Sequence, residues 1–228
     1  MSNVLIDFEL KNKIFKFLLS SLFLMFLLLF VFAGSLYFWQ AWILLSCLVV
    51  SSSLIVTYFL KNDQPLLERR LHFNEKELRQ KLIVKISIFF FVCGLVVAGL
   101  DYRLSLSKVP LILVLTSDLI ILIGYRIVFL VFKENSYASR TIEVMEGQKV
   151  VASGAYSIVR HPMYVGVIII YIFIPLALGS FWSFLFFAPI IPLVILRIIN
   201  EEFVLLRDLN GYKEYVQKVK YRLVPCIW

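Results

Sequence analysis

The sequence predicts an all-α polytopic membrane protein with about six transmembrane helices. Of its 228 residues, 61% are hydrophobic, and the mean hydropathy is +0.89. Only 17% are charged, whereas an ordinary soluble domain has about 25% charged residues. Apolar runs of about 20 residues recur along the chain, and each is long enough to cross the hydrocarbon core of a bilayer. We therefore interpret residues 1–228 as a single integral membrane domain.

The apolar runs place six spans along the chain. The first run follows Lys11, Lys13 and Lys16, and no small-residue cleavage site comes after it, so we expect a retained span and not a signal peptide. Six crossings would put both termini on the same side of the membrane. The predicted spans are 14–38, 41–60, 83–103, 109–132, 163–178 and 181–199.

The loops that link successive predicted spans differ sharply in their number of Lys and Arg residues, and the difference alternates along the chain. The links near Gln40 and Gly179 carry no charge, and the link 101–108 is a mild exception with Arg103 and Lys108. Because Lys and Arg mark cytoplasmic loops, we expect both termini and the charged loop 61–85 to be cytoplasmic, in a bacterial cytoplasmic membrane. The net charge of +8 then sets orientation, and no nucleic acid partner is expected. The basic residues of the loop are Lys61, Arg69, Arg70, Lys76, Arg79, Lys81 and Lys85.

The last two spans form a hairpin that proline interrupts. A helix over 163–178 would be only about 24 Å long, and Pro175, Pro189 and Pro192 predict kinks. Broken helices at membrane depth are tolerated where protein or a cavity surrounds them, so we expect the hairpin to line a pocket. The polar stretch 133–162 and an amphipathic C-terminal helix within 200–222 flank it, and would bind any water-soluble cofactor at the cytoplasmic surface.

Several common site types have no support in the sequence. There is no Gly-x-Gly-x-x-Gly or Walker motif for a nucleotide. With only His72 and His161, no histidine metal site is expected, and we expect His72 to be solvated. Cys47, Cys93 and Cys226 lie far apart, so neither a disulfide framework nor a zinc spacing is present.

The densest polar motif, residues 154–166, leads directly into the fifth span. Pro162 suits the first turn of a helix and favours an extended His161. The unpaired N–H groups at this helix start favour an anionic ligand group, and Tyr164 shares the face of His161. The alternative is a plain helix entry, in which Arg160 and His161 meet lipid phosphates and Tyr164 joins the aromatic belt.

A second cluster of ionisable residues ends the sixth span. Arg197 and Glu201 share a helix face at a spacing of four residues, and ionisable groups at this depth are costly unless paired or functional. The alternative is a snorkelling arginine paired with a surface glutamate. Asp118 and Arg126, within the fourth span, are expected to face the bundle, where they line a substrate path or form a structural pair.

An ordered set of motifs resembles the isoprenylcysteine carboxyl methyltransferase family, within the wider group that includes phospholipid N-methyltransferases. The similarity covers about residues 133–228, and the segment 65–70 is similar to part of bacterial members. In order, the motifs are Gly154-x-Tyr156, Arg160-His161-Pro162-x-Tyr164-x-Gly166, a hydrophobic hairpin, Glu201-Glu202, Gly211-Tyr212-x-x-Tyr215 and Arg222-Leu223-Val224-Pro225.

The resemblance implies a methyltransferase that uses S-adenosyl-L-methionine in a non-Rossmann membrane site. Residues 133–228 would be the catalytic region, and residues 1–132 would supply four N-terminal helices. Arg197 matches an arginine assigned to the substrate carboxylate, and Arg197 and Glu201 are the expected catalytic residues; Gln148 stands where animal members have histidine. The positions that match cofactor contacts are Gln148, Lys149, Val150, Val151, Tyr156, His161, Pro162, Met163, Tyr164 and Glu201.

The expected acceptor is lipophilic, with the carboxylate of a prenylcysteine-like or other isoprenoid or lipid molecule as nucleophile. Membrane lipids are the other expected partners, and no metal is expected. An amine acceptor would need a base, for which Glu202 and Tyr164 are candidates. Three alternatives stay open: a phospholipid N-methyltransferase, a nicotinamide-dependent sterol-type reductase, which shares an Arg-His-Pro-x-Tyr-like segment, and a non-catalytic membrane protein.

Overall fold

The chain folds into a bundle of long helices. The computed structural model describes residues 2–72, 75 and 77–228, and within them every regular element is helical. The prediction of an all-α membrane protein is therefore confirmed. The elements are α1 (Ser2–Ala33), α2 (Trp39–Asn62), α3 (Gln64–Leu71), α4 (Leu78–Leu104), α5 (Leu111–Glu134), the 3₁₀ turn η1 (Gly154–Ser157), α6 (Pro162–Ala177), α7 (Phe184–Phe187), α8 (Ile190–Asp208) and α9 (Tyr212–Lys218).

The six predicted spans correspond to helices of the structure. In the described part of the chain, five segments are long and apolar enough to cross a membrane. A sixth, α6, is apolar but shorter, as the sequence predicted for 163–178. The chain is thus a multi-pass membrane protein. The five long segments are Phe8–Ala33, Trp39–Asn62, Leu78–Leu104, Leu111–Glu134 and Phe184–Asp208.

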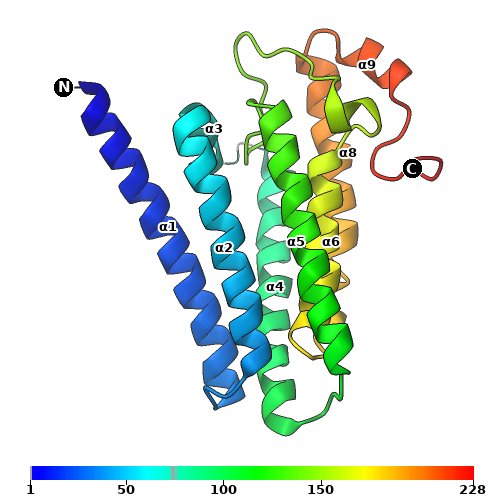
Figure 1. Ribbon diagram of the computed structural model, residues 1–228. Coiled ribbons are helices and arrows are strands. Elements are labelled where there is room, and N and C mark those ends of the chain that lie inside the picture. Colours follow the sequence, from blue (N-terminus) through cyan, green and yellow to red (C-terminus); the bar gives the residue numbers. More distant parts are fainter. Residues whose placement is uncertain (1, 73–74, 76) are drawn as a thin grey trace.

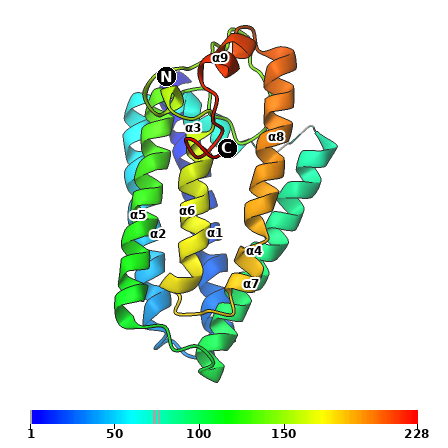
Figure 2. The same cartoon turned by 90° about the vertical axis from the view of Figure 1, so that its right-hand side faces the viewer.

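Both termini lie at the same end of the bundle, together with α3, α9 and the loop that follows α5 (Figure 1). We call this the terminal end. The three short links 34–38, 105–110 and 178–183 lie at the opposite end (Figure 2). This arrangement agrees with the even number of crossings that the sequence predicted.

Two glycines let α5 and α6 pack closely. A Cβ atom at Gly166 would lie 2.7 Å from the carbonyl oxygen of Gly124, and a Cβ at Gly124 would lie 2.9 Å from the carbonyl of Gly166. Small residues allow this approach of two helix backbones in a membrane. The close neighbour that Gly166 admits is therefore another backbone, and α5 fixes the position of the first turns of α6.

Replacement of Gly166 by alanine is expected to destabilise the bundle by about 1–3 kcal/mol, because the added methyl group overlaps a backbone oxygen that cannot swing away. Thermal unfolding of the purified variant in detergent measures the loss. Ser46→Ala, at an exposed position of α2, is the control and should unfold as the unmodified protein does. An unchanged unfolding temperature for Gly166→Ala would contradict this account of the α5–α6 contact.

Pro162 and Pro189 lie at helix boundaries of the C-terminal hairpin, whereas Pro175, where a kink was also predicted, lies inside α6. Pro162 is the first residue of α6, with His161 as its N-cap residue, because a missing N–H has no cost in the first turn. In the second half of the hairpin, α7 stops at Phe187 and α8 starts after Pro189. Pro192 cannot donate a backbone hydrogen bond, which favours an interruption here.

One expectation about α5 is wrong. Asp118 faces the bundle, with 4% of its surface exposed, and neither carboxylate oxygen has a hydrogen-bond partner among the described residues. Arg126, by contrast, is exposed, with its guanidinium 5.2 Å from the centre of the Phe129 ring. Eight residues along a helix turn the side-chain direction by about 80°, so the two residues do not share a face.

Candidate active site

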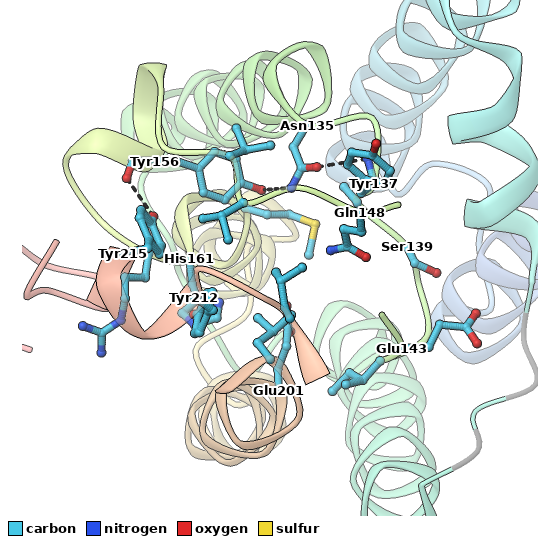
Figure 3. A pocket seen from close by; sticks show the side chains of 18 of the residues that line it. Asn135, Tyr137, Ser139, Glu143, Gln148, Tyr156, His161, Glu201, Tyr212 and Tyr215 are labelled. Carbon is cyan, nitrogen blue, oxygen red and sulfur yellow. Dashed lines mark hydrogen bonds between the residues drawn. The ribbon is translucent and has the colours of Figure 1, made fainter. Parts of the chain in front are cut away.

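A hollow lies at the terminal end of the bundle, with an empty volume of about 860 Å³ that includes space open to solvent. Its walls come from the loop after α5, η1, the start of α6, the end of α8 and α9 (Figure 3). We call it the polar hollow. Its lining residues are Asn135, Tyr137, Ala138, Ser139, Thr141, Ile142, Glu143, Gln148, Lys149, Val150, Val151, Tyr156, Arg160, His161, Met163, Tyr164, Arg197, Glu201, Leu205, Leu209, Tyr212 and Tyr215.

The structure brings nearly all of the predicted site residues to this hollow. Pro162 is the exception: it is buried in the first turn of α6 and does not line the hollow. Segments separated by some fifty residues of sequence thus meet at one place. The predicted residues in the lining are Gln148, Lys149, Val150, Val151, Tyr156, His161, Met163, Tyr164, Arg197 and Glu201.

Tyr164 links Glu201 to Arg197. Its hydroxyl donates to Oε2 of Glu201 at 2.6 Å and accepts from Nε of Arg197 at 3.0 Å. The four-residue spacing of the arginine and the glutamate on α8 lets both reach the one tyrosine on α6. The neutral hydroxyl of Tyr164 therefore bridges the Glu201 carboxylate and the Arg197 guanidinium, which do not form a surface ion pair.

Arg197 is held from several sides and keeps donors for a ligand. Nη1 donates to Oε1 of Gln80 at 3.1 Å, and Nη2 donates to the backbone carbonyl of Arg140 at 2.6 Å. Oε2 of Glu75 lies 3.8 Å from Nη2. A guanidinium has five N–H donors, and with Nε bound to Tyr164 these bonds use one donor on each nitrogen. One N–H on each Nη atom is not used by these bonds, and the Glu75 carboxylate already faces Nη2 at ion-pair distance.

Glu202 has a different role from its neighbour Glu201. The residue is 4% exposed, and its carboxylate accepts from Nε of Arg160 at 2.6 Å, from Nε2 of His161 at 3.3 Å and from Nε of Arg222 at 2.7 Å. It does not line the polar hollow. Of the two candidate bases for an amine acceptor, Tyr164 alone faces the hollow.

The start of α6 is also tied to the C-terminal segment through the backbone. The N–H of Arg160 donates to the carbonyl of Tyr221, and the N–H of His161 donates to that of Arg222, both at 2.9 Å. Arg160 and His161 are 6% and 5% exposed, and Tyr164 is 6% exposed. The alternative in which these side chains meet lipid phosphates and join the aromatic belt is therefore wrong.

Sequence reasoning did not assign several lining residues. Tyr215 donates to the backbone carbonyl of Tyr156 at 2.7 Å, and Asn135 donates to the hydroxyl of Tyr156 at 2.9 Å. Burial raises the pKa of Tyr156 to about 12, so it stays a neutral donor at physiological pH. The hydroxyl of Tyr212 is buried and has no partner in the described chain. The Gly-Tyr-x-x-Tyr motif was the available signal for both C-terminal tyrosines.

An apolar cluster holds α9 over the polar hollow. Tyr212 and Tyr215 pack with Leu209 and Val219 against Val150 and other partly buried side chains. The hollow thus combines hydroxyl, amide and carboxylate groups with aliphatic side chains. This composition suits a ligand that has both polar and apolar groups. Within the described residues, no group of three or more His, Cys, Asp or Glu side chains is arranged to hold a metal ion.

Comparison with known families identifies the segment that builds most of this site. Residues 112–209 match the phospholipid methyltransferase family. The resemblance to the wider group of isoprenylcysteine carboxyl and phospholipid methyltransferases is thereby confirmed for this segment, and it indicates a membrane methyltransferase. No curated protein and no solved structure matches the chain.

The segment 112–209 also forms part of a second, larger hollow, with an empty volume of about 1190 Å³, between α4, α6 and α8. We call it the lipid-side groove, because most of its wall is apolar. Four residues line both hollows: Ser139, Met163, Tyr164 and Arg197. The other residues of the groove are Arg70, Ile83, Val84, Ser87, Ile88, Phe91, Arg140, Val167, Tyr171, Ile190, Leu193 and Val194.

Proposed function

We propose that the protein is an S-adenosyl-L-methionine-dependent methyltransferase that transfers a methyl group to the carboxylate of a lipophilic acceptor. One observation carries this proposal: the polar hollow and the lipid-side groove meet at Tyr164 and Arg197. A water-soluble donor and a lipid acceptor need such a meeting point.

The polar hollow fits the methyl donor by its chemistry. S-adenosyl-L-methionine supplies a methyl group on a positively charged sulfur atom. Glu201, Gln148 and the hydroxyl of Tyr212 offer polar groups for its ammonium, hydroxyl and carboxylate functions, and Val150 and Leu209 offer apolar contact for its ring. The residues that would hold it are Gln148, Lys149, Val150, Val151, Tyr156, His161, Met163, Tyr164 and Glu201.

Arg197 would hold the acceptor carboxylate. The N–H groups of Arg197 that its protein contacts leave unused would donate charge-assisted hydrogen bonds to that carboxylate. A carboxylate is already ionised at neutral pH, so no residue has to remove a proton. The role of the protein is then to align the two reactants and keep water out, which accounts for a large share of rate enhancement in such reactions.

An amine acceptor is the second candidate, because the matching family is described as phospholipid methyltransferase. Transfer to an amine requires a group that removes a proton. Tyr164 would take the amine proton while its own hydroxyl proton passes to Glu201, the carboxylate to which it donates. The two candidates give chemically different products, a methyl ester or an N-methylated amine.

We also propose that the terminal end of the bundle faces the cytoplasm of a bacterial cell. The basic side chains of α3 and of the start of α4 lie at this end of the molecule, and such residues mark the cytoplasmic side. The polar hollow would then open toward the compartment that contains the methyl donor.

The direct test is incubation of the purified protein with radiolabelled S-adenosyl-L-methionine and a total lipid extract. We expect label in a lipid species, and release of volatile label by mild alkali if the product is a methyl ester. Calorimetry in detergent should detect binding of S-adenosyl-L-methionine and none of a nicotinamide dinucleotide. Absence of S-adenosyl-L-methionine binding, or binding of the dinucleotide, would refute the proposed function; label that resists alkali would favour the amine.

A further inference from the structure

Arg70, in the last turn of α3, is partly buried, and its guanidinium contacts uncharged groups. Its Nη1 atom donates to the carbonyl of Ser139 at 3.0 Å and lies 3.9 Å from the sulfur of Met163. Its guanidinium carbon is 4.9 Å from the centre of the Phe132 ring. None of these contacting groups, all within the described part of the chain, is charged, and a charge that is partly withdrawn from water without a counter-ion in contact is costly.

Two further arginines lie at the same place. Arg70 from α3, Arg140 from the loop after α5 and Arg197 from α8 all line the lipid-side groove. Burial, with the charges of the other two, lowers the pKa of Arg70 to about 10, which still leaves it positive at neutral pH. Glu75 approaches Arg197 and accepts from the N–H of Ile142, and Glu201 is bound to Tyr164.

The three arginines lie in a groove that is otherwise mainly apolar, as the head-group site of a lipid would. They line the part of the groove that borders the polar hollow, since Ser139, Met163 and Arg197 belong to both. The rest of the groove is lined mainly by aliphatic and aromatic side chains of α4, α6 and α8. An anionic group with a hydrocarbon chain would satisfy both parts, whereas a free anion would use only the arginines.

We propose that Arg70 and Arg140 form an anion-binding subsite beside Arg197, which takes the phosphate or carboxylate head group of the lipid acceptor. This inference rests on the proposed function, because the occupant is the methyl acceptor. The uncharged contacts of Nη1 orient the Arg70 guanidinium, and its remaining nitrogens supply donors to the head group. Arg70 is thus a specificity-determining residue that a search for cofactor motifs does not reveal.

Binding of simple probes tests the subsite without knowledge of the natural acceptor. The full chain in a neutral detergent would be titrated with dodecyl phosphate, with dodecanoate and with 1-dodecanol, and binding measured by thermophoresis. We expect both anionic probes to bind at least about tenfold more tightly than the alcohol. Arg70→Gln should weaken both anionic probes about tenfold and leave the alcohol unchanged, and Arg70→Lys should lie between them.

Arg69→Gln is the matched control. Arg69 is adjacent on α3, donates from Nη1 to the carbonyl of Ser136 at 2.6 Å and lies 5.8 Å from the Tyr137 ring, but it does not line the groove. Its loss should leave probe binding within about twofold of the unmodified protein. Arg140→Gln, in a loop and not in a helix, gives a second test should Arg70→Gln fail to fold.

Distinct outcomes separate this inference from the proposed function. Anionic probes that bind Arg70→Gln and Arg140→Gln as tightly as the unmodified protein would overturn the subsite, as would inorganic phosphate that binds as tightly as dodecyl phosphate. Calorimetry with S-adenosyl-L-methionine is run on the same samples. If Arg70-dependent probe binding persists in a protein that does not bind S-adenosyl-L-methionine, the anion subsite stands and the proposed methyl transfer falls.

Discussion

Arg197→Ala is expected to lower methyl transfer by about a hundredfold to a thousandfold, the range found when a fixed donor to the reacting group is removed. Binding of S-adenosyl-L-methionine should change little, because Arg197 would hold the acceptor and Glu201 and His161 the donor. Arg197→Lys keeps the charge but loses the fork of two parallel donors, so it should recover only part of the activity. Turnover and calorimetry on the same preparations measure the two effects.

The control for this prediction lies on the same helix. Arg207 is exposed at the end of α8 and pairs with its neighbour Asp208 at 2.7 Å. Arg207→Ala should therefore leave both turnover and donor binding near those of the unmodified protein. His161→Ala and Glu201→Ala should weaken donor binding. An equal loss of donor affinity in Arg197→Ala would count against the division of roles between acceptor and donor residues.

Glu202→Ala should unfold the terminal end. The carboxylate is the shared partner of Arg160, His161 and Arg222, and its removal leaves the buried Arg160 charge without that partner. Breaking a buried ion pair from one side costs about 3–5 kcal/mol. The thermal unfolding temperature in detergent should fall strongly, with loss of donor binding as a consequence.

The adjacent carboxylate provides the contrast. Glu201→Ala removes a group that lines the polar hollow and accepts one hydrogen bond, from Tyr164. It should weaken binding of S-adenosyl-L-methionine by about tenfold with a small change in unfolding temperature. If Glu201→Ala destabilised the protein as much as Glu202→Ala, both glutamates would be structural, and the assignment of Glu201 to the donor would fail.

Helical periodicity explains which parts of the site could be predicted from sequence. Pairs at intervals of three or four residues lie on one face, and this placed His161 near Tyr164 and Arg197 near Glu201. Runs of apolar residues placed the spans because their length matches the bilayer. The family resemblance supplied the strip from Gln148, which no periodicity marks.

Contacts between distant segments could not be predicted in this way. Adjacent helical residues point about 100° apart, but which of Glu201 and Glu202 faces the hollow depends on where Arg160 and Arg222 lie. Arg70 looked like one basic residue of a charged loop until α3 brought it next to the loop after α5. The orientation of Arg126 required the rotation of α5 in the bundle, which its hydrophobic pattern did not fix.

The backbone hydrogen bonds from Arg160 and His161 to Tyr221 and Arg222 have a consequence for biogenesis. Tyr221 and Arg222 do not line the polar hollow, but they follow all of its lining residues in the chain and are therefore synthesised after them. In a nascent chain whose membrane helices are already inserted, the start of α6 therefore lacks these bonds. The proposed donor site would be complete only once residues 221–222 have been synthesised and have bound Arg160 and His161.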